Sequence, residues 1–276
     1  MTLVQSDGSS VHGIAQQLNG KDAYLVNVGT GRGALIINAD DWGRDRHTTD
    51  EIFQCIRHGT VSSTSAMVFM EDSERAADLA RESNVDAGLH LNFTSPFASS
   101  RCSSVVAKYQ ERIASFLTRK RWAQVVFHPG LRSAFRAVVE AQLEEFHRLF
   151  GGGPNRIDGH HHMHLCANVL LENLLPAGTV ARRNFTFAPG EKSRLNIWYR
   201  QRIDKRLARR HRLTDMLFLL PPLAPPSRVD HILSLSESHV IELETHPVNA
   251  DEKAFLLGAG MLRRAEEKAI TRGFVF

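Results

Sequence analysis

Residue types that bind metal ions stand at the predicted ends of apolar strands in this chain of 276 residues. Asp40 and Asp41 follow the apolar residues 34–37, and His90 lies in the apolar sequence GLHL. Apolar strands have no structural need for such residues at their ends, and burying them without partners costs free energy. Carboxylate and imidazole groups bind divalent cations, so these positions are candidates for metal-dependent chemistry.

A histidine cluster lies on another predicted strand, where Asp158, His160, His162 and His164 occupy alternate positions. In a regular strand such residues share one face. Three imidazoles on one face indicate a divalent metal ion. His161 would point to the opposite face, as a core residue or as a support for a metal ligand. A histidine-rich loop without function is the alternative interpretation.

The adjacent carboxylates of Asp40 and Asp41 point in different directions from a regular strand. One of them can therefore bind a metal ion while the other contacts a bound water, and capping of the next turn is the alternative role. His246 precedes Pro247 where the chain leaves a further strand, and it is a candidate acid, ligand or strand-end histidine. His90 taken alone is more often a buried, hydrogen-bonded histidine, but the other clusters favour a ligand.

Strands and helices that alternate along the chain must position these residues. The predicted strands are residues 34–37, 62–69, 87–93, 156–163, 180–187, 216–220 and 240–245. The predicted helices are residues 48–58, 72–83, 133–150, 168–175, 194–211 and 251–270. This alternation predicts an α/β fold with a mainly parallel sheet, either open or closed into a barrel. In both architectures function collects at the carboxyl ends of the strands.

The chain is predicted to form one catalytic domain over residues 33–276, preceded by a polar, loosely ordered leader at residues 1–32. Residues 95–130 break the alternation and are predicted to be a polar and basic insertion on the loop side. Within the basic segment 200–212, a solvated helix face is favoured over a phosphate-binding surface. Arg182 and Arg183 could hold an anionic substrate group or lie on the surface.

Composition indicates an ordinary soluble globular protein, with 42% hydrophobic and 23% charged residues. The net charge of +4 is too small to indicate a nucleic-acid partner. Three widely spaced cysteines argue against a disulfide framework or a thiolate zinc site. The sequence contains no apolar run long enough to span a membrane and no signal-peptide pattern, so a cytoplasmic enzyme is expected. The oligomeric state is left open, and a homodimer would be compatible with the sequence.

Five motifs resemble the YdjC-like carbohydrate deacetylases, a family that includes chitooligosaccharide deacetylases and hopanoid-cluster deacetylases. The motifs are LIINADDWG (35–43), GTVSSTSAMV (59–68), GLHLNFT (88–94), IDGHHHMHL (157–165) and ETHPVNADE (244–252). They occur in the family's order, from about Leu35 to the C-terminal helix. The resemblance implies a variant (β/α) barrel with mainly parallel strands.

The resemblance also implies one divalent metal ion held by Asp41, His90 and His160, with Asp40 as the catalytic base and His246 as the acid. The ion would be zinc, cobalt, nickel or magnesium. The substrate would be an N-acetylated sugar or oligosaccharide, from which acetate is released. This agrees with elementary chemistry, because a divalent ion lowers the pKa of bound water and polarises an amide carbonyl.

Four further residues are expected to contact the substrate or to support the ligands. Asp158 would orient a ligand histidine, and at least one of His162 and His164 would support the site or line the substrate groove. Trp42 could stack on a sugar ring or plug the mouth of the barrel.

The chain departs from the family pattern in three places. Trp42 stands where Phe is usual, Gly159 replaces the common Ser of the DSH motif, and the basic residues 95–121 replace a Gly-rich, Pro-containing stretch. The first two departures leave the metal chemistry intact, whereas the third bears on the substrate.

Two alternatives to a deacetylase are retained. The first is an inactive relative that binds a sugar or a metal ion, although such a protein needs no acid and base pair. The second is a metal-dependent phosphoesterase, a class that often uses two metal ions. Metal stoichiometry would separate them, because the sequence contains a convincing ligand set for one ion.

Overall fold

The computed structural model describes residues 33–120, 122–187, 190–258, 260, 263, 271 and 272. The predicted leader at residues 1–32 and most of the predicted helix beyond residue 258 lie outside the described residues. None of the helices described in these ranges combines the length and apolar character needed to cross a membrane.

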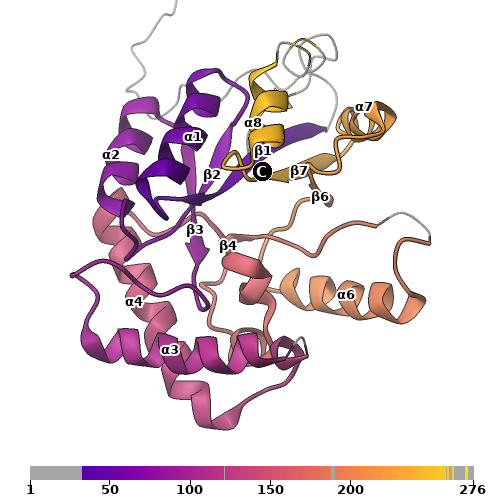
Figure 1. Cartoon of the computed structure of the whole chain (residues 1–276). Helices are drawn as coiled ribbons and strands as arrows, with labels where there is room; N and C mark the ends of the chain where they lie inside the picture. Colours follow the sequence, from indigo (N-terminus) through magenta and orange to yellow (C-terminus); the bar gives the residue numbers. More distant parts are fainter. Residues whose placement is uncertain are drawn as a thin grey trace, which may run out of the picture.

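A parallel sheet forms the centre of the molecule (Figure 1). Its strands are β1 (Ala34–Trp42), β2 (Ser63–Ala66), β3 (Asp86–Leu91), β4 (Arg156–Gly159), β5 (Val180–Ala181), β6 (Met216–Leu219), β7 (Val240–Thr245) and β8 (Thr271–Arg272). Their order is β5-β4-β3-β2-β1-β7-β6, and β8 pairs with β1. Every strand pair is parallel. The sheet curls into a partial barrel, which confirms the predicted variant (β/α) barrel.

Helices connect the strands and cover the outer face of the sheet. They are α1 (Arg46–Arg57), α2 (Ser73–Ser83), α3 (Ser104–Arg119), α4 (Arg132–Phe150), α5 (Ala167–Leu171), α6 (Arg194–Leu207), α7 (Pro226–Leu235) and α8 (Ala250–Leu257). Asp45 caps α1 by accepting a hydrogen bond from the Thr48 backbone N–H. This cap belongs to neither Asp40 nor Asp41, so the capping role considered for those two residues is excluded.

The two faces of the curled sheet differ in chemistry. Alternate residues of a strand point to opposite faces, and the outward ones, such as Leu35 and Ile37, join the hydrophobic core under the helices. The residues between them face the inside of the barrel and are mostly polar and buried. They include Asn38, Asp40, Ser63, Ser65, His90, Arg156, Asp158, Glu242 and Glu244. The inside of this barrel is therefore a buried polar network.

The two edge strands, β5 and β6, approach each other through the segment that follows β5. The Thr186 backbone N–H donates to the Leu217 carbonyl at 2.8 Å, and the Leu217 N–H donates to Thr186 Oγ1 at 3.2 Å. Regular pairing of β5 ends at Ala181, so the observed strand is shorter than the predicted strand 180–187. The segment that follows β5 contacts β6 at Thr186, so it lies between the two edge strands.

The predicted strand 156–163 is wrong in its second half. β4 ends at Gly159, and residues His160–Leu165 form a 3₁₀ segment in which His161 and His162 have φ of 54° and 56°. A Cβ on Gly159 would lie 2.9 Å from the His164 backbone N. Glycine thus permits the chain to fold back against the strand end.

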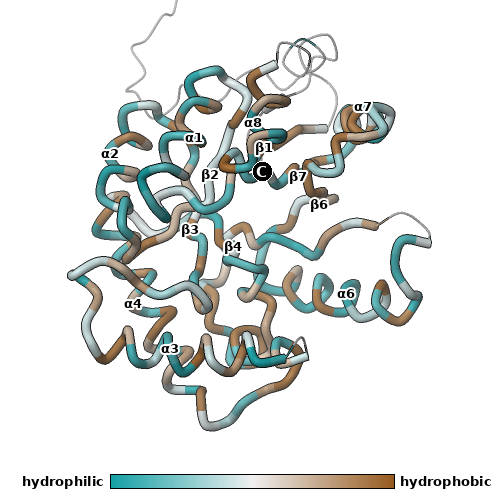
Figure 2. The backbone as a smooth tube through the Cα atoms, in the orientation of Figure 1, coloured by the Kyte–Doolittle hydropathy of each residue, from teal (hydrophilic) through white to brown (hydrophobic). Residues whose placement is uncertain are grey.

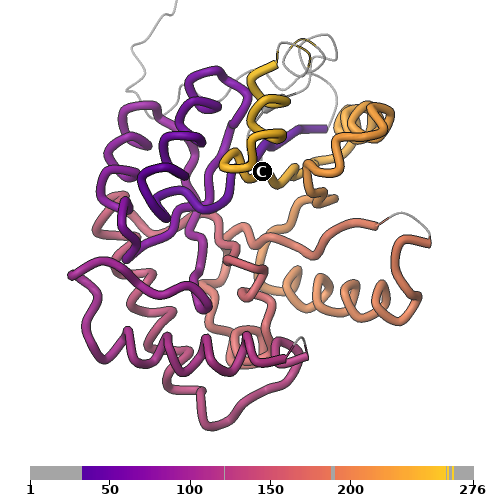
Figure 3. Tube along the Cα trace, viewed as in Figure 1, coloured from indigo at the N-terminus to yellow at the C-terminus, as the bar shows by residue number. Residues whose placement is uncertain are grey.

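The predicted insertion at residues 95–130 contains a regular helix, α3, which the weak sequence pattern did not reveal. Its apolar side buries Ile113 and Leu117, and Gln110 Nε2 donates to the Ser95 carbonyl at 2.9 Å. Figure 2 shows the resulting alternation of hydrophobic and hydrophilic residues along α3. Figure 3 shows that α3 and α4 together form the long excursion between β3 and β4. Another helix, α7, was also not predicted.

Candidate active site

Asp40 and Asp41 both reach the carboxyl end of the sheet because β1 is irregular there. Its register with β2 shifts between Ala39 and Trp42, and Asp41 has a left-handed φ of 69°. Neighbouring residues of a regular strand would face opposite sides, and a bulge re-aims one of them. Aspartate tolerates this conformation better than most residues, at a cost of about 1–3 kcal/mol. The irregularity brings both carboxylates to one site.

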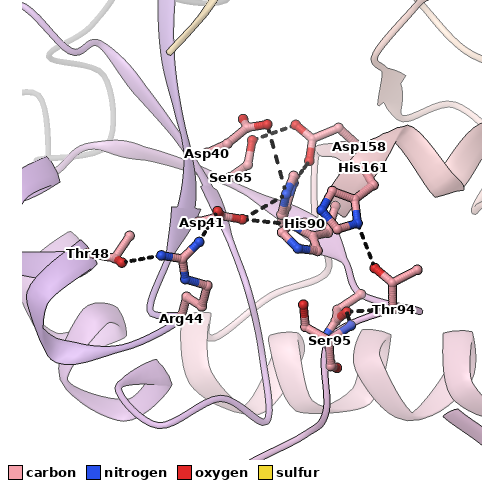
Figure 4. Close-up of polar contacts among 12 residues, drawn as sticks. Asp40, Asp41, Arg44, Thr48, Ser65, His90, Thr94, Ser95, Asp158 and His161 are labelled. Atoms are coloured by element: carbon pink, nitrogen blue, oxygen red, sulfur yellow. Dashed lines mark hydrogen bonds and ion pairs between the residues drawn. The ribbon is translucent and has the colours of Figure 1, made fainter. Parts of the chain in front are cut away.

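Asp41, His90 and His160 converge from three different segments. Asp41 Oδ1 lies 2.9 Å from His160 Nδ1 and 3.4 Å from His90 Nε2, and all three residues are buried. Figure 4 shows Asp41 and His90 facing each other across the strand ends. These three side chains, proposed as ligands from the sequence, are therefore close enough to share one cation.

The unpaired oxygen of Asp41 supports this interpretation. Asp41 Oδ1 is buried and accepts no hydrogen bond among the described residues, whereas Oδ2 accepts from Arg44 Nη1 at 2.7 Å. Ligand atoms about 2.1 Å from one ion lie about 3.0–3.4 Å apart in octahedral or tetrahedral geometry. The distances from Oδ1 to the two histidine nitrogens match that spacing. The residues present fit a divalent cation.

The electrostatics at His90 also favour a positive charge. Burial lowers the pKa of His90, but the negative charges of Asp40 and Asp158 outweigh burial and raise it to about 10. For Asp41, burial raises the pKa, but the contacts with His160 and His90 outweigh it and hold the pKa below its ordinary value. Carboxylates that stabilise a proton on His90 would likewise stabilise a bound cation.

Asp158 holds His90 in position. Its Oδ1 lies 2.6 Å from His90 Nδ1, which leaves Nε2 directed at Asp41. Its Oδ2 accepts hydrogen bonds from Ser65 Oγ at 2.5 Å and Arg156 Nη1 at 3.0 Å. A carboxylate behind a ligand histidine is a common support in metal sites, and it is the position that the sequence suggested for Asp158.

Asp40 is held by Arg182 through two parallel hydrogen bonds. Arg182 Nη1 donates to Asp40 Oδ2 and Nη2 donates to Oδ1, both at 2.7 Å. Asn38 Nδ2 also donates to Oδ1 at 2.7 Å. Burial raises the pKa of Asp40, but the Arg182 charge outweighs burial and keeps it below the ordinary value. Asp40 is thus an oriented, ionised carboxylate.

Arg182 lies at the centre of the barrel, so the surface location considered from the sequence is wrong. Only 1% of its side chain is exposed. Besides Asp40 it contacts Asp158 at 3.1 Å, Glu242 at 2.7 Å and Glu244 at 3.1 Å. These carboxylates satisfy the guanidinium completely, which also argues against an anionic substrate group at Arg182.

Glu242 was missed in the sequence, and Glu244 was noted there without a role. Burial raises the pKa of Glu242 above its ordinary value, although Arg182 opposes the shift. The available signal was the alternation of Glu242, Glu244 and His246 on one strand, since such residues share a face. The sequence pattern does not show that a buried cation, Arg182, pairs with Glu242 and Glu244.

His246 lies at the end of β7, close to Asp40. The nearest ligand atoms of Asp40, Glu244 and His246 lie within 4.8 Å of one another. The His246 backbone N–H donates to Glu252 Oε2 at 2.9 Å, which anchors the strand exit. His246 is partly exposed. His246 is therefore neither a core residue nor a free surface residue, and it lies at the rim of the site that contains Asp40.

His162 and His164 do not share a face with His160, because the 3₁₀ segment replaces the predicted strand. His162 Nε2 lies 3.2 Å from Glu244 Oε2, and its ring packs 4.6 Å from the Phe185 ring. His164 is fully buried, with Nε2 2.9 Å from the Arg182 carbonyl oxygen. Burial lowers the pKa of His164 to about 3, so this imidazole is neutral.

His161 does not point into the core, as a regular strand would require. It is exposed, its ring centroid lies 3.9 Å from that of His160, and Nδ1 lies 3.0 Å from Thr94 Oγ1. Figure 4 shows this contact at the edge of the site. Its left-handed backbone turns the side chain outward.

Trp42 lies in the hydrophobic core, so the predicted sugar-stacking or barrel-plugging role is wrong. The side chain is 0% exposed and belongs to the core on the helix side of the sheet. Its Nε1–H donates to the Ala76 carbonyl oxygen at 3.0 Å. A fully buried indole cannot stack on a sugar, so Trp42 supports the strand end by packing.

The chain is similar to two curated deacetylases over about half of its length. A chitooligosaccharide deacetylase of Proteus mirabilis (strain HI4320) is 35% identical over 137 residues, which cover 48% of this chain and 50% of that protein. A carbohydrate deacetylase of Mus musculus is 30% identical over 143 residues, which cover 49% of this chain and 44% of that protein. The chain spans about half the length of the curated relatives it matches.

A solved structure from Enterococcus faecalis V583, named for cellobiose-phosphate cleavage, has the same fold. The superposition covers 87% of this chain and 96% of that chain, with a TM-score of 0.58 and 19% sequence identity. The YdjC-like protein family matches residues 34–271, which include strands β1 to β7 and all the candidate site residues. The chain therefore belongs to the YdjC-like protein family.

Proposed function

We propose that this protein is a metal-dependent carbohydrate deacetylase that releases acetate from an N-acetylated sugar or oligosaccharide. The observation that carries the proposal is the convergence of Asp41, His90 and His160 beside the oriented carboxylate of Asp40. The deacetylase names of the similar proteins support the substrate class.

Asp41, His90 and His160 would hold one divalent cation. When bound, such an ion supplies a more acidic water and polarises the acetyl carbonyl. The chain's own contribution is to fix the donors, because Arg44 holds Asp41 and Asp158 holds His90. A neutral amide is a weak electrophile, so this preorganisation matters for the rate.

Asp40 would accept the proton of the attacking water. A general base must be ionised and oriented, and Arg182 provides both conditions. A pairing arginine also weakens a base, because it stabilises the carboxylate. Here the guanidinium charge is shared with Asp158, Glu242 and Glu244, which moderates that loss of basicity.

His246 would protonate the departing sugar amine. It lies at the site rim near Asp40 and is partly exposed, so it can reach both solvent and substrate. An acid and a base on adjacent strand ends can act on the two sides of one amide bond.

The structure also bears on the phosphoesterase alternative. Asp40, Glu244 and His246 form a second group with ligand-like spacing. However, Arg182 donates to the carboxylates of both Asp40 and Glu244. Its positive charge would repel a second cation, so we favour a single metal ion and amide hydrolysis.

The proposal is tested by acetate release from N-acetylated mono- and oligosaccharides after reconstitution with zinc, cobalt, nickel or magnesium. We expect acetate to form with at least one metal and one bound ion per chain. The matched control is Asp41→Asn, which should release less acetate at the same metal concentration. Hydrolysis of phosphate esters with two bound ions, and no acetate, would contradict the proposal.

A further inference from the structure

Helix α6 exposes a group of large apolar side chains near its first turns. Leu195 is 73% exposed and Trp198 is 53% exposed, and Tyr199 beside them is also exposed. Large apolar side chains that lie next to one another on a surface mark interaction sites more often than single ones do. We call Leu195, Trp198 and Tyr199 the apolar end of α6.

The opposite side of α6 is anchored to the barrel, so its outer side is defined. Asp204 is buried, and its Oδ1 accepts from the Asn184 backbone N–H at 3.0 Å. Leu207, on the same side of the helix as Asp204, is buried in the core. The apolar end therefore lies on the solvent side of the helix, because the side that carries Asp204 and Leu207 packs against the domain.

Basic residues continue the same outer stripe toward the end of the helix. Arg202 and Lys205 are exposed, and they follow Trp198 at helical spacing. The Arg202 guanidinium carbon lies 5.2 Å from the centroid of the Trp198 ring. Arg209, just beyond the helix, is also exposed. The stripe thus passes from apolar to cationic along one face.

The positive charge of the protein is concentrated in this segment. Residues 194–212 contain eight Lys or Arg and one Asp, a net charge of +7 with His neutral. The whole chain has a net charge of +4, so the remaining residues together carry −3. Figure 1 shows α6 at the side of the barrel, away from the helices α1 and α2. An anionic partner would be attracted to this face.

We propose that α6 docks the protein on an anionic lipid surface. Arg202, Lys205 and Arg209 would contact phosphate headgroups, and Leu195 and Trp198 would enter the boundary of the acyl region. Proteins bind anionic membranes by inserting apolar side chains and placing Lys or Arg at the lipid headgroups, and Trp is favoured at that boundary. A phosphate backbone of nucleic acid would use the cations but would leave Leu195 exposed.

Helix α6 and the segment before it are connected to the candidate site by contacts with aromatic rings. The Arg200 guanidinium carbon and Lys192 Nζ each lie 5.1 Å from the Phe187 ring centroid. The Phe187 ring lies 6.4 Å from that of Phe185, which packs against His162. Arg200 of α6 is thus linked through Phe187 and Phe185 to His162 at the candidate site.

The test is cosedimentation of the full chain with vesicles. We expect binding to phosphatidylcholine vesicles that contain phosphatidylglycerol, weak binding to phosphatidylcholine alone, and weaker binding at high salt. Replacing Arg202 and Lys205 by Ser should lower partitioning about fivefold for each lost cation, equivalent to ~1 kcal/mol each. Failure to bind the anionic vesicles at low salt would overturn the proposal.

The chain offers a matched control for the apolar end. Trp122 is 54% exposed, and Lys120 Nζ lies 5.5 Å from its ring centroid, so it resembles Trp198 in exposure and in its cation. Trp198→Ser and Leu195→Ser should each weaken vesicle binding about tenfold, since each removes inserted apolar surface. Trp122→Ser should leave binding unchanged. Equal losses at both tryptophans would contradict docking through α6.

Fluorescence gives an independent readout that does not depend on the stability of a serine variant. Trp122→Phe leaves Trp198 and the buried Trp42, and its emission should shift to shorter wavelength with anionic vesicles. Trp198→Phe should show no shift. Binding of a DNA duplex without binding of vesicles would overturn the proposal in favour of a nucleic-acid partner. Circular dichroism of each variant verifies that the fold is retained.

Discussion

Arg182 and Asp40 lie 142 residues apart in the chain and are joined by two hydrogen bonds of 2.7 Å inside the barrel. The contact links β1 to the segment that follows β5, and thus connects distant parts of the sheet. Because Arg182 also contacts Asp158, Glu242 and Glu244, one guanidinium compensates part of the charge of four buried carboxylates. Stability and the candidate site therefore depend on the same side chain.

The first prediction concerns this buried cation. Arg182→Met removes the guanidinium that four buried carboxylates share and should lower the free energy of unfolding by about 3–5 kcal/mol. Arg182→Lys keeps the charge but loses the paired geometry, so its loss should be smaller. Urea unfolding measures both. Arg119→Met, at an exposed position, should change stability by only about 0.5 kcal/mol. A Met variant as stable as the parent protein would show that the network does not stabilise the fold.

The second prediction concerns the proposed base. Asp40→Asn keeps the size and one acceptor oxygen but cannot take a proton from water. It should retain the metal ion and lose about 10²–10⁴-fold in turnover. Metal content and acetate release are the two measurements. Loss of the metal together with activity would mean that Asp40 is a ligand.

The third prediction concerns Asp41, the proposed metal ligand. Asp41→Asn removes a negative ligand and should weaken metal affinity, so activity should recover partly at high metal concentration. Removal of metal from the parent protein with a chelator should abolish turnover, and adding metal back should restore it. If Asp41→Asn holds metal normally while Asp40→Asn does not, the two roles are reversed.

The fourth prediction separates orientation of His90 from support of Arg182. Asp158→Asn removes the negative charge behind His90 and should weaken metal affinity about 10–100-fold. Glu242→Gln is the matched control, because Glu242 contacts Arg182 without contacting His90. Calorimetric titration with the metal should show an effect for Asp158→Asn alone. Equal effects of both substitutions would assign the loss to the Arg182 network.

The fifth prediction tests the location of Trp42. Trp42→Phe loses the hydrogen bond to the Ala76 carbonyl and should destabilise the protein by about 1 kcal/mol. KM for the sugar should not change, because the indole is buried. A clear rise in KM with unchanged stability would restore the sugar-stacking hypothesis.

Local pattern was sufficient for the parallel sheet and for several residues of the site. Alternating strands and helices predicted a mainly parallel sheet, and the resemblance to a family implied that this sheet forms a variant barrel. Parallel strands bring their carboxyl ends to one edge. Asp40, Asp41 and His90 could therefore be expected to meet. The resemblance to a family then selected His160 from the histidine cluster, and the structure places it beside Asp41. Their roles in catalysis remain predictions.

The tertiary structure decided the positions that depend on distant partners. His161 to His164 leave the strand pattern because Gly159 lets the chain fold back and His164 packs against the Arg182 carbonyl. Arg182 is buried rather than exposed because carboxylates from β1, β4 and β7 repay its desolvation. A local sequence window contains none of these partners, since burial of a charge depends on groups that only folding brings together.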